Sequence, residues 1–504
     1  MNKKLLFCLA VLTTAITGLF GRAVAQDLPG KRDSLTSAIL KEKRIIQVVL
    51  PAKYKPGSAD KYDVLYVLDG DWNTKLMSQV QQFIEGEAGM PPIIIVGVLN
   101  TDRNRDFLPT NVADNKTSGG ADKFLNFFKS ELIPYIDKTY PSNGSNTLFG
   151  HSFGGVFVTY ALLNEPQLFK SYIAADPSYW WDKGVMRKQV KDKMPGLVNI
   201  NKTFYISGRE GFGMKDMGIT AMDTVLKATI PVGIVWKISA YPDETHGSVR
   251  LKSMYDGLKF SYSGYTAKPV EFHPMQGVML KGKPIKIWSL DDAGNVRYTI
   301  DGSEPLITST KLPQELTLSA PARVTAKLFT NAGRYDRITT GDFKEGAYWP
   351  ALAKAKNMKP GGFHYSYYEG EWDKLPDFTT LKPVKTGIAD STFNIDKMPR
   401  QNNFALLLEG DLEVKEDGYY IFGLNSDDGS RFYLNNQLLM DDDGLHDNQA
   451  NKSYIVPLQK GFYPVRIEYF QKDGGRNLKV VYITPSINAP QPIAIPLSLQ
   501  YGKN

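Results

Sequence analysis

The chain has 504 residues, of which 42% are hydrophobic and 22% charged, and it carries a formal net charge of +7. This is an ordinary globular composition, and the length is sufficient for more than one domain. The positive excess is mild for such a length, and no basic stripe alternates with aromatic residues, so nucleic acid is not an expected partner.

The first 25 residues are expected to be a signal peptide that is not part of the fold. Two lysines precede an apolar run at 5–20, and the Ala-Val-Ala motif at 23–25 fits a signal-peptidase site. The run is short for a membrane span, and no stop-transfer pattern follows it. We therefore expect an exported bacterial protein, periplasmic, cell-surface or extracellular, with no integral membrane segment in its mature form.

The same segment contains the only cysteine, Cys8. Phe7 is a poor lipobox residue, so lipidation is not expected. After cleavage the chain would have no cysteine, which suits export in a bacterium without disulfides. Loss of the three basic residues of this segment lowers the formal net charge from +7 to +4.

The most informative motif is Gly-His-Ser-Phe-Gly-Gly at 150–155, which is a G-x-S-x-G pattern. A short run at 146–149 suits a buried strand before it, and residues 156–163 suit a buried helix after it. A strand, a glycine-tight turn and a helix form a nucleophile elbow, which lifts the serine hydroxyl clear of the sheet. The N–H groups that begin the helix face the place where negative charge develops. The pattern predicts Ser152 as a catalytic nucleophile.

The chain has five histidines, one of which should be the general base. Only His151 and His246 lie in the region with an α/β pattern. His151 adjoins Ser152, so its side chain should point away from the hydroxyl, and a packing role is expected. His246 lies in a loop between a strand-like segment, 233–238, and a helix-like segment, 249–260. An α/β-hydrolase carries its base in such a late loop, and we therefore predict His246 as the base.

The acid should lie between the serine and the histidine in the chain, at the carboxyl end of a strand. Glu210 follows the strand-like segment 203–208, and Asp176 directly follows the segment 172–175. We prefer Glu210 and keep Asp176 as the alternative. Four further acids are less well placed: Asp216, Asp223, Asp243 and Glu244.

An oxyanion hole needs two backbone N–H donors. One should belong to Phe153, the residue after the predicted nucleophile. The other should come from the loop after an early strand at 64–68, where Gly70 lets the backbone turn. We predict the N–H of Asp71 as this second donor.

Five segments of this part of the chain follow one another in a characteristic order: 66–70, 96–106, 150–155, 177–181 and 245–249. Together they resemble the "putative esterase" family of α/β-hydrolases over about residues 35–262. That family includes siderophore esterases of the enterobactin and bacillibactin type and is related to feruloyl and acetyl-xylan esterases. The resemblance implies Ser152 as nucleophile, His246 as base, and Trp180 and Trp181 near an acyl or sugar pocket. Core packing is the alternative for both tryptophans.

One departure from the family concerns Asp176, because the family more often has serine before the Pro-Ser pair. This keeps Asp176 open as the acid or as a substrate contact. Arg103 and Arg105 are candidates for contacting an anionic substrate, and an ion pair with Asp102 or Asp106 is the competing role for them.

Past about residue 265, helical patterns give way to short alternating segments with Gly, Asn and Asp turns. Residues 266–345 include the strand-like segments 296–305 and 322–329. They resemble the small β-sandwich at the C-terminus of chitobiases and hexosaminidases. We expect a spacer or docking domain here.

Residues 355–500 resemble a PA14 β-sandwich, on the segments 418–434, 443–446 and 460–469. PA14 modules often bind carbohydrate, which the resemblance implies as a partner. In the adhesin branch two consecutive aspartates hold calcium, whose hard charge suits carboxylate oxygens. Asp427 and Asp428 fall at that position, and capping of a β-turn is the alternative role for them. No cofactor is expected for ester hydrolysis.

The expected architecture is multidomain, with an α/β-hydrolase domain followed by two β-sandwich modules. Its expected parts are a signal peptide at 1–25, an esterase domain at 26–265, a small β-sandwich at 266–345 and a PA14-like domain at 355–500. We expect a secreted serine esterase that removes acetyl or hydroxycinnamoyl groups from a glycan. Two alternatives stay open: a siderophore esterase that cleaves a catecholate trilactone, and a carbohydrate-binding surface protein with an inactive hydrolase domain.

Overall fold

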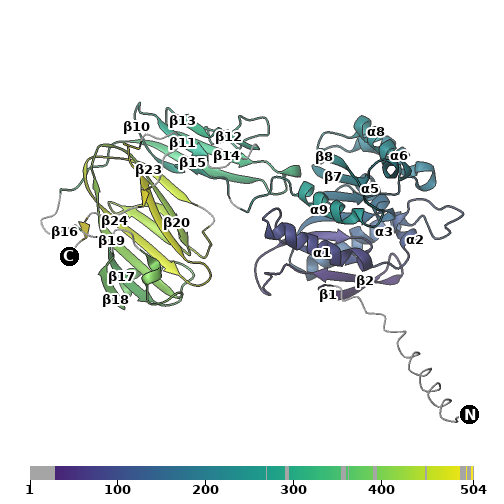
Figure 1. Ribbon diagram of the computed structural model, residues 1–504, viewed down its shortest axis with the longest axis horizontal. Helices are drawn as coiled ribbons and strands as arrows, with labels where there is room; N and C mark the ends of the chain where they lie inside the picture. The colour runs from purple at the N-terminus through teal and green to yellow at the C-terminus, as the bar shows by residue number, and fades with distance from the viewer. Residues whose placement is uncertain are drawn as a thin grey trace, which may run out of the picture. The chain divides into compact units, whose positions relative to one another are not determined.

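The computed structural model describes residues 29–267, 269–289, 295–353, 359–360, 362–389, 394–448, 451–487, 495–496 and 501–502. The expected signal peptide lies outside the described residues. The chain divides into two compact units (Figure 1). The first unit runs to Tyr265 and includes the segment Asn331–Arg334, and the second comprises Thr266–Thr330 and Tyr335–Asn504.

The first unit is built on an eight-stranded sheet with the order β1-β2-β4-β3-β5-β6-β7-β8. Its strands are β1 Lys31–Ser37, β2 Glu42–Val49, β3 Tyr62–Val67, β4 Ile93–Val98, β5 Ser142–His151, β6 Ser171–Ala175, β7 Lys202–Arg209 and β8 Ile234–Tyr241. β2 is antiparallel to β1 and β4, and all other neighbours are parallel. Every residue of β3, β4 and β6 is buried, as expected where helices cover both faces of a parallel sheet.

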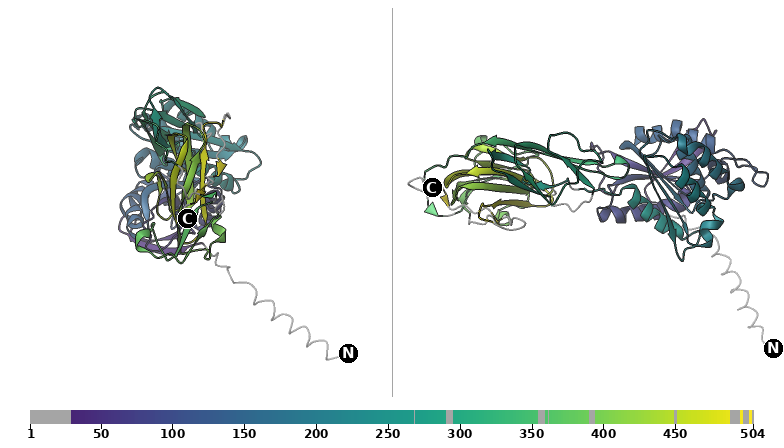
Figure 2. Two further views of the ribbon diagram at one scale, coloured as in Figure 1. Left: turned by 90° about the vertical axis from the view of Figure 1, so that its left-hand side faces the viewer. Right: turned by 90° about the horizontal axis from the view of Figure 1, so that it is seen from above.

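Helices lie on both faces of this sheet (Figure 2). They are α1 Gly70–Gly86, α2 Arg103–Phe107, α3 Ala121–Phe127, α4 Ile133–Thr139, α5 Phe153–Asn164, α6 Trp181–Lys193, α7 Phe212–Asp216, α8 Ile219–Thr229 and α9 Val249–Ser261. α1 packs beside α9, and α5 packs beside α2, α3 and α6. Nine of the twelve residues of α5 are buried, because this helix is apolar on nearly every side. The structure confirms the predicted α/β-hydrolase class for this part of the chain.

The parallel strands place four polar side chains at one edge of the sheet. Strands β5 to β8 run in the same direction, so their carboxyl ends meet at the same edge, where open α/β sheets bind ligands. Ser152 follows β5, Asp176 follows β6, Arg209 ends β7 and His246 lies in the loop after β8.

The segment Asn331–Arg334 belongs to the first unit although it lies far downstream in the chain. The side chain of Arg334 is 3% exposed, and its Nε lies 2.6 Å from Oδ2 of the buried Asp63. Its Nη1 donates hydrogen bonds to the hydroxyls of Thr147 and Ser171 at 2.8 and 3.0 Å. Because Arg334 neutralises a buried carboxylate, we add this segment to the proposed esterase domain at 26–265.

The second unit consists of strands and, among the described residues, of short 3-10 turns. Its strands are β9 Phe272–His273, β10 Gln276–Leu280, β11 Ile285–Ser289, β12 Val296–Thr299, β13 Glu315–Leu318, β14 Ala322–Leu328, β15 Arg337–Gly346, β16 Lys359–Pro360, β17 His364–Glu369, β18 Lys385–Ile388, β19 Phe404–Val414, β20 Gly418–Asp427, β21 Ser430–Leu434, β22 Gln437–Asp442, β23 Lys452–Leu458, β24 Gly461–Gln471, β25 Asn477–Ile483, β26 Ile495–Pro496 and β27 Tyr501–Gly502. This agrees with the predicted change from an α/β to an all-β pattern near residue 265.

One sheet of the second unit runs across the predicted boundary between the two β-modules, in the order β12-β14-β15-β10-β23-β20-β25-β26. The crossing pair is β10 and β23, which are parallel, with Gly277 opposite Ile455. A Cβ on Gly277 would lie 2.1 Å from the Ile455 carbonyl oxygen, so this close approach needs glycine. One apolar cluster likewise contains Phe343 together with Ile421 and Ile455. The two predicted modules are therefore fused through a common sheet.

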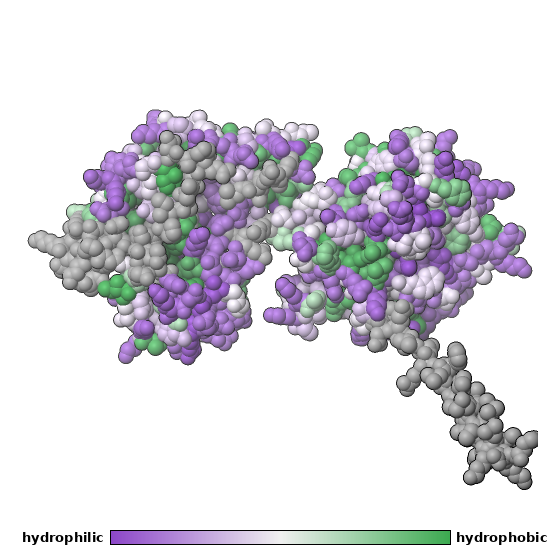
Figure 3. All heavy atoms as spheres, viewed as in Figure 1, coloured by the Kyte–Doolittle hydropathy of each residue, from purple (hydrophilic) through white to green (hydrophobic). Residues whose placement is uncertain are grey.

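The surface visible in Figure 3 is mostly hydrophilic, with apolar residues in small groups. Within the described residues, none of the helices combines the length and the apolar character that a membrane crossing requires.

Candidate active site

Ser152 lies in a tight turn between β5, which ends at His151, and α5, which begins at Phe153. Its φ of 59° and ψ of −118° fall in a region that residues other than glycine rarely occupy, and such strain clusters at functional sites. A Cβ on Gly150 would lie 2.3 Å from the Gly154 carbonyl oxygen, and one on Gly155 would lie 2.8 Å from Pro177 Cβ. The turn thus needs glycine at both positions, and it has the predicted strand, turn and helix.

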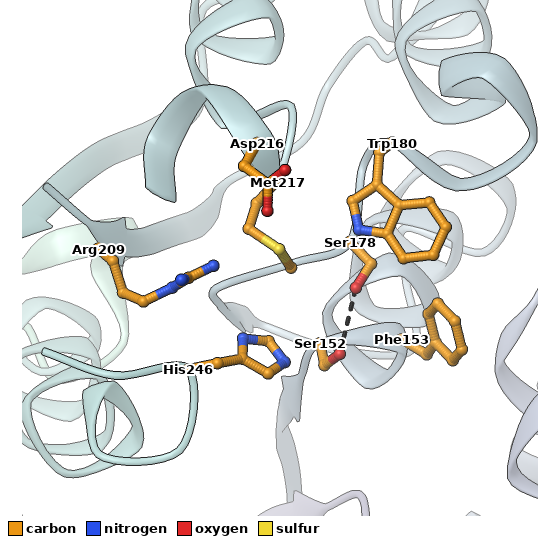
Figure 4. Close-up of a pocket in the computed structure, with 8 residues that line it drawn as sticks. All are labelled: Ser152, Phe153, Ser178, Trp180, Arg209, Asp216, Met217 and His246. Carbon is orange, nitrogen blue, oxygen red and sulfur yellow. Dashed lines mark hydrogen bonds between the residues drawn. The ribbon is translucent and has the colours of Figure 1, made fainter. Parts of the chain in front are cut away.

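His246 is oriented by Asp176. The Nδ1–H of His246 donates to Asp176 Oδ2 at 2.7 Å, so Nε2 is left to accept a proton. Asp176 is fully buried at the end of β6, whereas the imidazole of His246 is 43% exposed. Figure 4 shows this ring pointing toward Ser152. Ser152, His246 and Asp176 are thus arranged like a nucleophile, a base and an acid that orients the base.

Arg209 contacts the same carboxylate oxygen, with Nε 2.7 Å from Asp176 Oδ2. Burial favours the neutral form of Asp176, but the hydrogen bonds from His246 and Arg209 and the charge of Arg209 outweigh it and lower the pKa. Asp176 is therefore ionised at neutral pH. Its other oxygen, Oδ1, is buried and has no hydrogen-bond partner among the described residues.

The preference for Glu210 as the acid is corrected by this geometry. Glu210 is exposed, and its backbone N–H donates to Tyr241, which extends the pairing of β7 with β8. Asp176 follows β6, which is the direct neighbour of β5 in the sheet. It therefore lies one strand closer to Ser152 than Glu210 does, and it was the alternative that the sequence left open.

His151 supports the loop that carries His246. The Nε2–H of His151 donates to the carbonyl oxygen of His246 at 2.7 Å, and the two ring centroids are 4.4 Å apart. Burial, together with the charges of His246 and Arg250, lowers the pKa of His151 to about 3. His151 is therefore neutral and acts as a hydrogen-bond donor. The expected packing role includes this specific bond, which the sequence did not indicate.

Ser178 is the residue that contacts the hydroxyl of Ser152. The two Oγ atoms are 3.1 Å apart (Figure 4), and Ser178 is 2% exposed. Its backbone N–H also donates to the Ser152 carbonyl oxygen at 3.2 Å. Sequence reasoning missed both Ser178 and Arg209. The only available signal for Ser178 was its position within the segment 177–181.

A cavity of about 460 Å³ opens above Ser152. Its lining, drawn in Figure 4, consists of Ser152, Phe153, Ser178, Trp180, Arg209, Asp216, Met217 and His246. Trp180 and Trp181, which were both predicted to lie near the pocket, have different surroundings. Trp180 lines the cavity and is 49% exposed, whereas Trp181 is 6% exposed and its Nε1–H donates to Thr110 Oγ1. Trp181 is therefore part of the core rather than of the cavity wall.

Arg103 lies beside the elbow and not in the cavity wall. Its Nε pairs with the buried Asp69 at 2.7 Å, and its Nη2 donates to the His151 carbonyl oxygen at 3.1 Å. The guanidinium also lies over the Phe153 ring, 5.2 Å from its centroid. The partner of Arg103 is thus Asp69, whereas Arg105 has the expected partner, with its Nη2 2.7 Å from Asp106 Oδ1. These contacts assign Arg103 a structural role in place of the substrate contact.

Asp71 is the second residue of α1, and its carboxylate accepts a hydrogen bond from the Asn100 N–H at 2.9 Å. Its own N–H belongs to the first helical turn, where the helix supplies no acceptor. Phe153 lines the cavity beside Ser152, whereas Asp71 is not among the lining residues. The role of Asp71 as the second oxyanion donor stays a prediction.

Asp427 and Asp428 lie at the end of β20 in the second unit and are 7% and 6% exposed. Burial and the neighbouring carboxylates of Asp428 and Asp447 raise the pKa of Asp427. The backbone N–H of Lys472 donates to Asp428 Oδ2 at 2.8 Å. Within the described ranges, no three His, Cys, Asp or Glu side chains are grouped to hold a metal ion, so this pair supplies two carboxylates only.

Comparison with known proteins identifies two segments. Residues 37–200 match the model of the family described as "Putative esterase", and residues 359–495 match the model described as "PA14 domain". Both matches confirm the resemblances that the sequence motifs indicated.

Two curated proteins and one solved structure are among the proteins to which the chain is similar. The chain is 31% identical over 193 residues to the ferri-bacillibactin esterase BesA of Bacillus subtilis, covering 34% of this chain and 65% of that protein. It is 46% identical over 67 residues to the siderophore enterobactin esterase of Emericella nidulans, covering 13% of this chain and 22% of that protein. An IroE-like serine hydrolase from Shewanella oneidensis is 31% identical with a TM-score of 0.43, covering 45% of this chain and 78% of that chain. The chain thus spans less than two thirds of the length of both curated relatives.

Proposed function

We propose that this chain, whose residues 37–200 belong to the esterase family and whose residues 359–495 form a PA14 domain, is a serine carboxylic ester hydrolase. The observation that carries the proposal is the hydrogen bond from His246 to the buried Asp176 beside Ser152 in its strained turn. A hydroxyl, an imidazole and a carboxylate in this relation are the parts that acyl transfer needs.

In the proposed reaction, Ser152 Oγ attacks the ester carbonyl carbon while His246 Nε2 takes the hydroxyl proton. Asp176 stabilises the imidazolium that forms, and the N–H groups of Phe153 and Asp71 hold the oxyanion. The tetrahedral intermediate then expels the alcohol, which receives the proton from His246. Water, activated by the same imidazole, hydrolyses the acyl-enzyme and restores Ser152.

Kinetics of Ser152→Ala on an activated aryl acetate test this proposal. We expect kcat to fall at least about a thousandfold, because the nucleophile of such a unit is not replaced by its neighbours. Arg323→Gln, a change at an exposed side chain of β14 in the second unit, serves as the control and should keep the rate. Equal rates for wild type and Ser152→Ala would remove the catalytic claim and favour a carbohydrate-binding protein with an inactive hydrolase domain.

For the substrate, we propose an acetyl or hydroxycinnamoyl ester on a glycan. The support is the PA14 domain in the same chain, because binding to a polymer raises the effective concentration of its esters near Ser152. Trp180, half exposed in the cavity wall, suits stacking against an aromatic acyl group or a sugar ring. The expected signal peptide would export the enzyme to where such polymers lie.

A second candidate substrate is a catecholate trilactone siderophore. The observation that favours it is that the two curated relatives described above are named as siderophore esterases. Acetylated xylan, feruloylated arabinoxylan and a catecholate trilactone, each incubated with the full mature chain, separate the candidates. Release of acetate or ferulate supports the glycan ester, whereas cleavage of the trilactone alone contradicts it and supports the second candidate.

We also propose that Asp427 and Asp428 contribute two ligands to a calcium site in the PA14 domain. The support is that two consecutive carboxylates are both buried, 7% and 6% exposed, because a bound cation would offset the repulsion between them. Titration of the full chain with calcium, followed by calorimetry, should give saturable binding that Asp427→Asn and Asp428→Asn abolish. Unchanged binding in both variants would contradict this assignment.

A further inference from the structure

Among the described residues, the guanidinium of Arg209 is the one arginine group in the lining of the cavity above Ser152. Its side chain is 24% exposed, and Figure 4 shows the end of the guanidinium directed into the cavity. The stem is held in place by α7, because a Cβ on Gly213 would lie 2.6 Å from Arg209 Cβ. The cation is therefore fixed before any ligand binds.

Only one nitrogen of this guanidinium has a partner among the described residues. Nε donates to Asp176 Oδ2, and Nη1 and Nη2 have no hydrogen bond or ion pair in that part of the chain. Arginine carries five N–H groups, so the four on Nη1 and Nη2 remain available to a ligand. A substrate that covers these donors without accepting from them would displace their water and leave them unsatisfied, which costs free energy.

The other residues with acidic or basic side chains in the described lining of the cavity are His246 and Asp216. Asp216 is the last residue of α7, and no ion pair joins it to Arg209 in the described structure. Arg209 therefore offers donors to an anionic oxygen, and the Asp216 carboxylate opposes that anion from the same cavity. Removing one or the other charge should shift the preference for an anion in opposite directions.

We propose that Arg209 is the anion-binding group of this cavity, and that the preferred esters carry a carboxylate, phenolate or similar anionic oxygen near the scissile bond. This inference rests on the proposed ester hydrolysis and adds a substrate class to it. A planar guanidinium with two free nitrogens suits a bidentate contact with the two oxygens of a carboxylate.

Arg209 also contacts the acid Asp176, so the test must separate substrate binding from positioning. Two matched pairs of esters do so: 3-acetoxybenzoate with 3-acetoxybenzamide, and the 4-nitrophenyl monoesters of adipic acid and adipamic acid. Each pair differs in charge but hardly in shape, with the charge on the alcohol side in the first and on the acyl side in the second. The measured quantity is the ratio of kcat/KM for the anionic ester to that for its neutral partner.

In Arg209→Gln, this ratio should fall at least about tenfold in one of the two pairs, mainly through KM of the anionic ester. In Asp216→Asn, the ratio for the same pair should rise. The matched control is Arg250→Gln, which removes a positive charge near His151 from a residue outside the cavity lining and should leave the ratio within about twofold.

A merely structural role of Arg209 would lower kcat for both members of a pair equally and leave the ratio unchanged, which overturns the inference while ester hydrolysis stands. Failure of the wild type to hydrolyse all four esters would instead contradict the proposed function, and the inference with it. If Arg209→Gln does not fold, as judged by circular dichroism, Asp216→Asn decides, and an unchanged or lower ratio there overturns the proposal.

Discussion

The carboxylate of Asp176 links two side chains, since His246 Nδ1 and Arg209 Nε both contact its Oδ2 at 2.7 Å. In Asp176→Asn, the imidazole would lose the group that fixes its tautomer, and we expect kcat on an aryl acetate to fall by about three to four orders of magnitude. Glu210→Gln is the matched control, because Glu210 is exposed. Its kcat should stay within about twofold, and a larger loss for Glu210→Gln than for Asp176→Asn would contradict the assignment.

His151 gives a second prediction at the residue scale. Its pKa is lowered from 6.5 to about 3 in the folded state, so between these values the unfolded chain binds one more proton at this site. The free energy of unfolding then rises with pH there, by about 1.4 kcal/mol per pH unit from this residue. Chemical denaturation at pH 4, 5 and 6 should show this slope in the wild type and its loss in His151→Gln. Equal slopes for the two proteins would contradict the assigned neutral state.

How far the sequence predicts these residues follows from how local each signal is. Ser152 could be predicted as the candidate nucleophile because a strand, a turn and a helix surround it. His246 could be predicted as the candidate base because the chain has few histidines. The choice between Asp176 and Glu210 depends on which strand lies next to β5, and that order is a property of the sheet. Ser178 and Arg209 were missed for the same reason, since only the folded sheet brings the ends of β6 and β7 to Ser152.

At the scale of elements, two adjacent glycines at the start of α5, Gly154 and Gly155, differ in how much space surrounds them. A Cβ on Gly155 would lie 2.8 Å from Pro177 Cβ, whereas one on Gly154 would lie 3.5 Å from its nearest neighbour, Asp69 Oδ2. Gly155→Ala should lower the free energy of unfolding by about 1–3 kcal/mol through overpacking and displace the neighbouring Asp176. Gly154→Ala should cost less than about 1 kcal/mol. Denaturant unfolding measures both, and equal losses would contradict the packing of α5 on Pro177.

The pattern of elements was predictable where it is local and not where it depends on distant pairing. Hydrophobic runs and turn residues indicated the α/β class of the first unit and the β class of the second. The parallel pairing of β10 with β23 joins residues near 277 and 455, and neither strand carries a mark of its partner. Two separate β-modules were therefore expected where the structure has a shared sheet.

At the scale of the whole molecule, the first unit is discontinuous in sequence. Arg334 pairs with the buried Asp63 and lies 4.4 Å from the centroid of the Tyr262 ring. Arg334→Met should lower the free energy of unfolding of this unit by about 3–5 kcal/mol, because it leaves a buried carboxylate without its cation. The double variant with Asp63→Asn should lose less than the sum of the two single changes. Additive losses in denaturant unfolding would contradict a direct pairing.

The central claim is that Ser152, activated by His246 and Asp176, forms a covalent acyl-enzyme. The most direct measurement treats the full mature chain with a fluorophosphonate, which reacts with activated serines, and maps the adduct by peptide mass spectrometry. We expect a single adduct on Ser152, slowed strongly in Asp176→Asn, and no adduct in Ser152→Ala. An unmodified Ser152 in a folded chain, or an adduct on another residue that persists in Ser152→Ala, would contradict the account.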